Sequence, residues 1–441
     1  MYIRRHIEQA VLERAKMKGA VVVTGARQVG KTTLIETLKP DVPKITFDDL
    51  SARQRAIAEP SVFFDFNPPP VFIDEVQYAP VIFHYIKILL DKSHNKGDFF
   101  LTGSQRFELM ENVTESLAGR AGILELHGLS MREIGGDSWN KPFLPTMEYL
   151  RERKTHKHTA GKTIAGNAAT GKTIAGNAAT ERTITGYTSA NSTIMKVPKI
   201  WETIHRGSLP ELITNPDFNW RQFYADYIGT YLERDVRKLT QVADEDSFYK
   251  FMTVCAAMTG QLLNLASIAK NVGISEPTAK RWLSILRASG IVYILKPYSN
   301  NAINRAVKTP KIHFLDIGLA AYLTRWLTPE TMLSGAMSGY FFESFVVGEI
   351  LKSYTNAGLE VDLYFARDGR QREIDLLIHE NNTLYPIEIK SSAEPSPSDI
   401  KNFDMLNEIK GVNIGEGGVV CTASELLPLK GKNYVIPLWA V

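Results

Sequence analysis

Residues 20–33 read AVVVTGARQVGKTT, and this stretch decides the fold of the first part of the chain. The apolar run at its start predicts a buried strand, and the segment from Lys31 to Leu38 predicts the helix that follows. Between them, residues 25–32 fit the phosphate-binding pattern G-x-x-x-x-G-K-[ST]. Glycines let such a loop turn its backbone N–H groups toward phosphates, and the helix that begins there adds a favourable dipole. The stretch therefore predicts a phosphate site between a strand and a helix.

This loop is expected to bind ATP together with Mg²⁺. Lys31 would reach the β- and γ-phosphates, and Thr32 would offer its hydroxyl to the metal. The residues expected to contact the nucleotide are Gly25, Ala26, Arg27, Gln28, Val29, Gly30, Lys31, Thr32, Thr33, Asp74 and Ser104. Residues 166–173 fit the same pattern, but no strand precedes them and they lie within a repeat. We therefore expect the phosphate site only at residues 25–32.

Two carboxylates follow a further apolar strand, which we expect at residues 70–73. Phosphoryl transfer needs a group that holds the metal and a group that orients and polarises the attacking water. Asp74 is expected to bind Mg²⁺ through its water shell, and Glu75 is expected to act on the water. The alternative is a solvated strand end with no catalytic role.

Polar residues also follow the strand that we expect at residues 98–101. A small polar side chain at this position could sense the γ-phosphate, and Ser104 is the first candidate, with Thr102 second. A simple polar turn is the alternative. Arg106 and Arg120 are candidates for neutralising charge on the γ-phosphate, although most arginines form surface ion pairs.

Length and composition limit the class of protein. A chain of 441 residues suggests about three domains, and 44 % apolar and 22 % charged residues are close to globular averages. A net charge of +3 excludes a global basic field for nucleic acid, so any such surface must be local. Two cysteines exclude a disulfide framework and a four-thiolate zinc site. The charged N-terminus and the lack of long apolar runs predict a cytoplasmic protein with no membrane partner.

Changes in composition and in the pattern of apolar residues divide the chain into four predicted segments. Strands expected at 20–23, 44–47, 70–73 and 98–101 alternate with helices, so residues 1–150 should form an α/β domain with a parallel sheet. Residues 151–197 contain the unit GKTIAGNAAT twice without change and should be a low-complexity insertion, with a short β-repeat as the alternative. Residues 198–330 are helical in pattern, including one helix at 227–236. Residues 331–441 should form a last α/β domain, which begins with a helix at 339–353.

The middle segment contains a candidate winged helix. Residues 265–275 read as a helix and a turn, a second helix is expected at 276–289, and residues 291–296 would supply a wing strand. Lys280, Arg281 and Arg287 lie on the second helix, beside Thr278 and Trp282. Residues 265–311 contain eight lysines and arginines and one acidic residue, which gives a local charge of +7. We therefore expect duplex DNA to bind there through its phosphates, with a protein-docking module as the alternative.

The last segment contains a constellation of carboxylates and a lysine. A hairpin is expected from residues 372–378 and 384–390, with Glu388 and Lys390 on one strand face and Ile387 and Ile389 packing inward. Asp375 begins the partner strand, and Glu343 lies on the preceding helix. The three carboxylates could hold one or two Mg²⁺ ions, with Asp375 and Glu388 as the main ligands, and could activate water for phosphodiester cleavage. Lys390 would steady the developing charge.

The motifs at 25–33, 73–77, 101–105 and 119–120 resemble the AAA+ superfamily. With the segments 206–211, 231–236 and 314–319, the chain is similar to prokaryotic predicted ATPases that join an AAA domain to a domain of unknown function of the DUF4143 type. This resemblance implies ATP binding but no settled biological role, and the decapeptide repeat departs from the family pattern. The last segment resembles the PD-(D/E)xK nuclease superfamily, with Ile374 in place of the proline. A homo-oligomer is left open.

Two functions compete on this basis. The first is an ATPase that drives a DNA transaction, with the winged helix as reader and the last domain as a nuclease. The second is a nucleotide-switched regulatory or docking protein whose nuclease-like domain is inactive. The intact carboxylates favour the first, whereas the absence of a separate basic tail keeps the second open.

Overall fold

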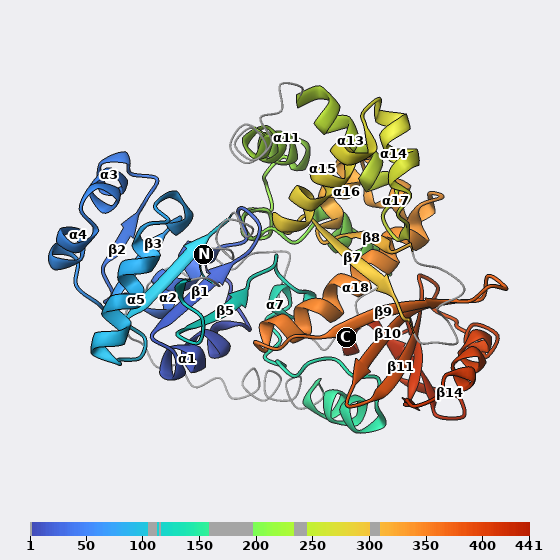
Figure 1. The fold of residues 1–441 in the computed structure, drawn as a ribbon. Coiled ribbons are helices and arrows are strands. Elements are labelled where there is room, and N and C mark those ends of the chain that lie inside the picture. The colour runs from blue at the N-terminus through green and yellow to red at the C-terminus, as the bar shows by residue number, and fades with distance from the viewer. Residues whose placement is uncertain (1, 105–112, 114–115, 158–196, 233–244, 300–308) are drawn as a thin grey trace, which may run out of the picture.

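The computed structural model describes residues 2–104, 113, 116–157, 197–232, 245–299 and 309–441. The repeat at 161–180, the candidate Arg106 and the end of the helix expected at 227–236 lie outside the described residues. Figure 1 shows a first α/β region beside a helical middle region and a C-terminal region built around a long sheet.

The first region begins with a helix and then alternates strands with helices. In chain order it contains α1 (Glu8–Met17), β1 (Ala20–Thr24), α2 (Lys31–Leu38), β2 (Lys44–Thr46), α3 (Leu50–Ala58), α4 (Pro60–Phe66), β3 (Val71–Asp74), the 3₁₀ helix η1 (Val76–Tyr78), α5 (Ile82–Ser93), β4 (Phe99–Gly103), β5 (Ala121–Glu125) and α7 (Met131–Ile134). The four strands expected from the sequence lie within two residues of their predicted bounds. The sequence did not predict β5, because its burial alternates as in an edge strand and Gly122 interrupts its apolar run.

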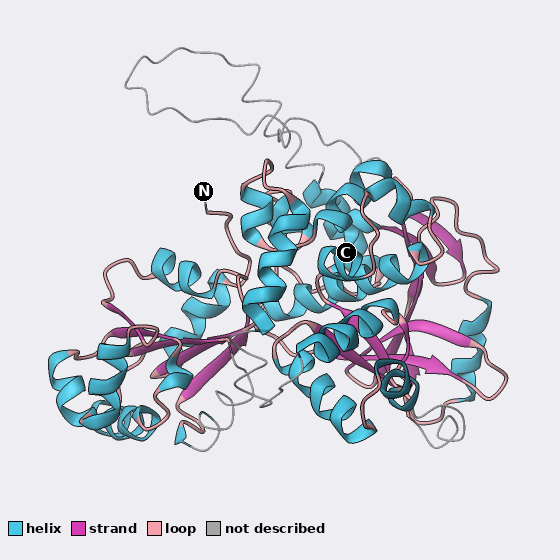
Figure 2. Ribbon diagram, turned by 90° about the horizontal axis from the view of Figure 1, so that it is seen from above, coloured by secondary structure: helices cyan, strands magenta, loops and turns pink. Residues whose placement is uncertain are grey.

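The five strands form one parallel sheet in the order β2-β3-β4-β1-β5, which confirms the predicted α/β architecture. All five residues of β1 are buried, and helices lie on both sides of the sheet in Figure 2. In such sheets the carboxyl ends of the strands share one edge, where ligands bind. The segments that follow β1, β3 and β4 therefore meet at one edge of the sheet.

The middle region is mostly helical. It contains α9 (Val197–Arg206), α10 (Pro210–Thr214), α11 (Trp220–Tyr231), α13 (Glu245–Ala257), β6 (Gln261–Leu262), α14 (Leu265–Val272), α15 (Glu276–Ala288), β7 (Val292–Pro297), β8 (Lys311–Phe314), α16 (Ile317–Leu323) and α17 (Pro329–Ser334). The helix expected at 227–236 begins earlier than predicted, at Trp220, because the side chain of Asn219 accepts hydrogen bonds from the next backbone N–H groups and caps it. Ser275 caps α15 in the same way, one residue before its predicted start.

The C-terminal region contains one long helix and a mixed sheet. Its elements are α18 (Ser338–Asn356), β9 (Asp362–Arg367), β10 (Glu373–Glu380), β11 (Thr383–Lys390), the 3₁₀ helix η3 (Lys401–Glu408), β12 (Asn413–Ile414), β13 (Gly417–Cys421), β14 (Leu427–Lys430), β15 (Asn433–Pro437) and the 3₁₀ helix η4 (Leu438–Ala440). The expected hairpin is the antiparallel pair β10–β11, and β7 of the middle region pairs with both β8 and β9. One ten-stranded sheet therefore joins the two regions.

The three regions share a continuous core. One cluster of buried apolar side chains runs from Ile7 to Val441 and includes residues of all three regions. Around the boundary expected at residue 150, side chains hydrogen-bond to the last residues of the chain: Arg132 Nε to the Val441 carbonyl at 2.7 Å, and Tyr149 OH to the Ala440 carbonyl at 3.0 Å. The end of the first predicted domain is thus packed against the C-terminal region.

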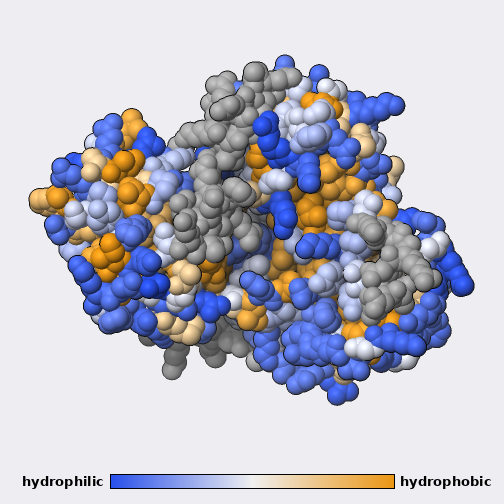
Figure 3. Space-filling model, in the orientation of Figure 1, coloured by the Kyte–Doolittle hydropathy of each residue, from blue (hydrophilic) through white to orange (hydrophobic). Residues whose placement is uncertain are grey.

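Apolar side chains gather on the outer face of the first region. Leu50 and Ile57 of α3 and Val62 and Phe66 of α4 are exposed, with Phe66 81 % exposed, and Figure 3 shows orange surface over these helices. The described part of the chain leaves this face uncovered.

No helix among the described residues is long and apolar enough to cross a bilayer.

Candidate functional site

The loop after β1 has a backbone that requires glycine at its two ends. Gly25 has φ 149°, and a Cβ there would lie 2.0 Å from the carbonyl oxygen of Leu126. Gly30 has φ 91° and stands immediately before α2, where a left-handed conformation strains other residues. The loop therefore curls tightly between β1 and the N-terminus of α2, as the phosphate-binding pattern predicts.

Lys31 and Thr32 begin α2 and point to different partners. Lys31 is buried, and its Nζ donates to the carbonyl oxygens of Gly25 at 3.0 Å and Ala26 at 2.7 Å. Thr32 Oγ1 lies 3.1 Å from both carboxylate oxygens of Asp74, at the end of β3. Thr102 Oγ1 of β4 donates to Asp74 as well. Three segments distant in sequence thus meet around one carboxylate.

Glu75 follows Asp74 and turns out of the strand. Its φ of 55° is a left-handed conformation, which is uncommon for a residue other than glycine and is often found at functional sites. Glu75 Oε2 accepts hydrogen bonds from Gln77 Nε2 at 2.5 Å and from Ser104 Oγ at 3.1 Å. Ser104 thereby lies beside Glu75, and Thr102, the second candidate, lies beside Asp74.

A buried arginine that sequence reasoning missed supports the loop from behind. Arg5 donates to the carbonyl oxygen of Val29 at 2.8 Å and to that of His127 at 2.8 Å, and its Nε lies 3.0 Å from Glu133. The guanidinium therefore ties the N-terminal segment to the phosphate loop and to the segment after β5. No sequence motif marks this role, because all its partners lie 24 or more residues away.

The structure excludes Arg120 as a charge donor to the phosphate site of its own chain. Its backbone carbonyl accepts from the N–H of Ala20, at the amino end of β1, whereas the phosphate loop follows the carboxyl end. Its side chain forms an exposed ion pair with Asp91 at 2.5 Å. Arg120 thus forms a surface ion pair, which is the alternative role that the sequence analysis gave for it.

The middle region borders the phosphate loop. Gly290, just after α15, lies so close that an added Cβ would be 3.3 Å from the backbone nitrogen of Ala26. Nearby, Asp316 accepts hydrogen bonds from Ser208 N at 2.7 Å and Tyr224 OH at 2.6 Å, and it caps α16. The Asp316 hydrogen bonds lie within the middle region, whereas the close approach of Gly290 to Ala26 makes the end of α15 a direct neighbour of the phosphate loop.

The candidate residues of the C-terminal region form two linked groups. In the first, Lys311 Nζ lies 2.7 Å from Glu343 Oε1 and 2.7 Å from Glu373 Oε1. Burial raises the pKa of Glu343 to about 8, although the charge of Lys311 acts against this rise. The sequence predicted Glu343 but neither Lys311 nor Glu373, because Lys311 comes from β8 in the middle region.

In the second group, Lys390 Nζ lies 3.0 Å from Glu388 Oε2 and 3.5 Å from Asp375 Oδ2. Asp375 lies at a bulge between β9 and β10, and it accepts the backbone N–H of Ile389 at 2.9 Å. Burial, followed by the charge of Asp375, raises the pKa of Glu388 to about 9. The side chain of Glu388 is buried.

The carboxylates of the C-terminal region are expected to bind metal, but those that the structure describes form no three-ligand site. Among the residues that the structure describes, no three His, Cys, Asp or Glu side chains are grouped so that they could hold one ion. The two lysines stand between the carboxylates. Glu388 Oε1 is nevertheless buried without a hydrogen-bond donor, the carboxylate of Asp375 lies beside Glu388, and oxygen ligands are those that Mg²⁺ prefers. Asp375 and Glu388 therefore remain suited to a single ion.

The basic surface of α15 is smaller than the sequence suggests. Lys280, Arg281 and Arg287 are exposed, but Trp282 packs inward, with ring centroids 5.1 Å from Phe248. Lys280 and Arg287 line a groove of about 750 Å³. Lys311 is buried, and two of the eight predicted cations lie outside the described residues.

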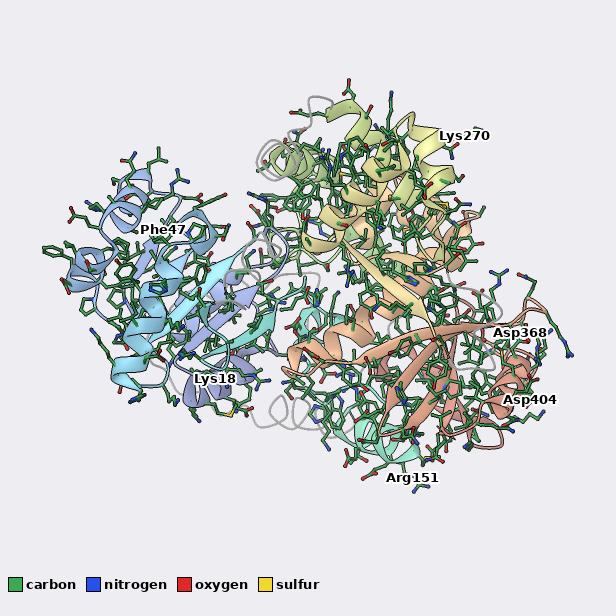
Figure 4. The ribbon with its side chains drawn as sticks, in the orientation of Figure 1. Lys18, Phe47, Arg151, Lys270, Asp368 and Asp404 are labelled. Atoms are coloured by element: carbon green, nitrogen blue, oxygen red, sulfur yellow. The ribbon has the colours of Figure 1, made fainter. Side chains whose placement is uncertain are left out.

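Lys270 of α14 is also exposed, at the outer side of the middle region (Figure 4). The local charge is therefore carried by α14, α15 and Lys296 of β7.

Residues 17–135 match the family model of an AAA domain. The chain carries an AAA domain. Residues 197–330 and 338–441 match two domains of unknown function, DUF8612 and DUF4143.

Similar proteins include the uncharacterized protein Rv2008c of Mycobacterium tuberculosis. It is 26 % identical over 446 residues, which cover 99 % of this chain and 84 % of that protein. Among solved structures, a Walker-type ATPase of Pyrococcus abyssi matches at 13 % identity with a TM-score of 0.39, covering 73 % of this chain and 96 % of that chain. The RuvB Holliday junction branch migration motor of Thermotoga maritima matches at 14 % identity with a TM-score of 0.26, covering 65 % and 86 %.

Within the AAA domain, the structure brings the predicted residues of the phosphate loop together with Asp74, Glu75 and Ser104. The P-loop ATPase fold of this domain is thus established.

Proposed function

We propose that the AAA domain hydrolyses ATP with Mg²⁺ and that hydrolysis is coupled to a transaction on duplex DNA. The observation that carries the ATPase proposal is the meeting of Lys31, Thr32, Asp74, Glu75 and Ser104 at one edge of the sheet. Phosphoryl transfer needs a residue that binds phosphate and two oxygen donors that bind the metal. It also needs a carboxylate that activates the attacking water and a polar residue that senses the γ-phosphate.

Each residue has a step that follows from its contacts. Lys31 would exchange the carbonyl oxygens of Gly25 and Ala26 for phosphate oxygens, because an anion attracts the ammonium more strongly than neutral carbonyls do. Thr32 and Asp74 would hold Mg²⁺, which when bound neutralises charge on the phosphates. Glu75, held by Gln77 and Ser104, would orient the attacking water and accept its proton.

Replacing Glu75 by Gln tests this assignment. The amide keeps a hydrogen-bonding side chain in place but cannot accept a proton, so hydrolysis should fall by about 10²- to 10⁴-fold while ATP still binds. Steady-state phosphate release and a separate binding titration measure the two effects. Glu13→Gln, an exposed carboxylate on α1, is the matched control and should hydrolyse ATP like the wild type. Unchanged hydrolysis in Glu75→Gln would remove Glu75 from the mechanism.

We propose duplex DNA as the partner of the middle region, with a winged helix as the reader. The order α13-β6-α14-α15-β7-β8 supports this proposal, since it has the three helices and three-stranded sheet of such a module. The exposed side chains of Lys280, Arg281 and Arg287 on α15 supply the charge that phosphates need.

DNA binding should depend on salt in proportion to the phosphates that are neutralised. If about three or four phosphates are contacted, the logarithm of the affinity should fall with the logarithm of salt at a slope of about −3 to −4. Replacing Lys280 and Arg281 together by Ala should flatten the slope by about two units for every duplex sequence. Fluorescence anisotropy across a salt series measures this slope. Replacing Lys430 and Lys432, which are exposed near the opposite edge strand, is the control. An unchanged slope in the α15 variant would favour the docking module.

A second candidate function is metal-dependent cleavage of phosphodiester bonds at the C-terminal cluster. It is favoured by the bulge that carries Asp375 and by the unpartnered oxygen of Glu388 beside it. Asp375 and Glu388 would hold one Mg²⁺, which when bound polarises a phosphate oxygen. Lys390 would stabilise the negative charge that develops on the phosphate.

A further inference from the structure

Lys311 is a buried cation enclosed by carboxylates of another region. Its side chain is only 3 % exposed, and its ammonium contacts Glu343 of α18 and Glu373 of β10 at 2.7 Å each. The ring of Phe365 lies below it, with the centroid 5.5 Å from Nζ. The other oxygen of Glu373 is held by Arg367 NH1 at 3.2 Å. Side chains from α18, β9 and β10 thus hold the ammonium of Lys311 in one position.

The ammonium takes the position of an ion that would bridge Glu343 and Glu373. A lysine ammonium is a compact point charge, and two carboxylate oxygens that both lie 2.7 Å from it cannot also approach a metal ion between them. The other half of the cluster differs. Lys390 Nζ lies 3.0 Å from Glu388 Oε2 and 3.5 Å from Asp375 Oδ2, but its side chain is 39 % exposed, and the second oxygen of Glu388 is buried without a hydrogen-bond donor.

We propose that Lys311 is a built-in cation that fills one of two cation positions and so limits the C-terminal cluster to a single divalent ion. This inference rests on the proposed metal site at Asp375 and Glu388 for the position of the remaining ion. Lys311 belongs to β8, within residues 197–330, whereas the carboxylates lie within 338–441. The middle region therefore sets how many ions the C-terminal region accepts, and Lys311 acts as a positioning residue for Glu343 and Glu373.

The test is Mn²⁺ binding to the full chain without nucleotide, counted by electron paramagnetic resonance. The wild type should bind one ion fewer than Lys311→Met, because the substitution frees Glu343 and Glu373 for a metal. In EDTA the variant should unfold at a temperature lower by on the order of 5 °C or more, since the buried Glu343 loses its counter-charge while Glu373 keeps Arg367. Millimolar Mn²⁺ should recover most of that loss in the variant and should change the wild type much less.

A second variant separates this effect from a failure to fold. Lys311→Met combined with Glu343→Gln removes one uncompensated charge, so it should fold in EDTA and gain no ion. The inference is overturned if Lys311→Met is as stable as the wild type in EDTA, or if Mn²⁺ neither binds additionally nor stabilises it.

A third variant separates the inference from the proposed metal site. Glu388→Gln removes a ligand of the proposed ion and leaves Lys311 with its partners. If wild type and Glu388→Gln bind equally few ions while Lys311→Met gains one, the inference about Lys311 stands and the metal site at Asp375 and Glu388 fails.

Discussion

Replacing Lys31 by Ala should weaken ATP binding by roughly 10²-fold. The ammonium is buried at the start of α2 and donates to the carbonyl oxygens of Gly25 and Ala26, which phosphate oxygens can replace as stronger acceptors. Losing a charge-assisted hydrogen bond at a site shielded from water costs about 3 kcal/mol, which lowers affinity by roughly 10²-fold. Titration calorimetry with ATP and Mg²⁺ measures the change directly.

The chain carries its own control for this experiment. Lys172 occupies the lysine position of the second G-x-x-x-x-G-K-[ST] match, in the repeat outside the described residues. Lys172→Ala should bind ATP like the wild type, because no strand precedes that motif in the sequence and no helix is expected after it. Equal affinities for the wild type and Lys31→Ala would contradict the assignment of the phosphate site to residues 25–32.

The phosphate site could be predicted because the residues that form it are neighbours in the sequence. The apolar run of β1, the two glycines and Lys31 are contiguous, so strand, loop and helix follow from neighbouring residues. Asp74 and Glu75 were found in the same way, since they stand at the end of a single apolar strand. Parallel pairing then brings separate strand ends to one edge without further information. Local patterns combined with a general rule of sheet topology were therefore sufficient.

Residues that act across long separations in sequence could not be predicted. Arg5 reaches Glu133 over 128 positions, and Lys311 reaches Glu343 from another region. A lone arginine or lysine carries no sign of which distant backbone or carboxylate it will meet. Trp282 gives the opposite lesson, because its place between basic residues suggested a surface role whereas helical spacing puts it with the buried Ala279, Ile285 and Leu286.

The C-terminal cluster shows both situations in one site. The hairpin with Asp375, Glu388 and Lys390 was predicted from alternation and a turn signal, and its strands pair as expected. The bulge at Asp375 was not predicted, because an extra residue in a strand depends on the partner strand β9. The burial of Glu388 was missed for a related reason, because alternation along a strand shows which residues share a face but not what covers that face. Pairing was thus readable from sequence, but the electrostatic setting was not.

Asp375→Asn should abolish Mg²⁺-dependent cleavage of duplex DNA if the C-terminal cluster is a nuclease site. The amide can still accept the backbone N–H of Ile389, so the fold should persist, but it lacks the charge that attracts a divalent ion. A bound metal contributes several kcal/mol to stabilising charge at phosphorus, so the rate should fall by at least roughly 10³-fold. Conversion of supercoiled plasmid to nicked and linear forms, with and without ATP, measures the rate.

Asp404→Asn is the matched control, because this carboxylate is exposed on η3 and belongs to neither lysine group (Figure 4). It should cleave like the wild type. If the wild type and Asp375→Asn produce the same products, the cleavage comes from a contaminant. If purified wild type cleaves no substrate in any divalent metal, the two lysines would be structural counter-charges. The C-terminal region would then serve as a scaffold for the nucleotide-switched docking protein that the sequence leaves as the competing function.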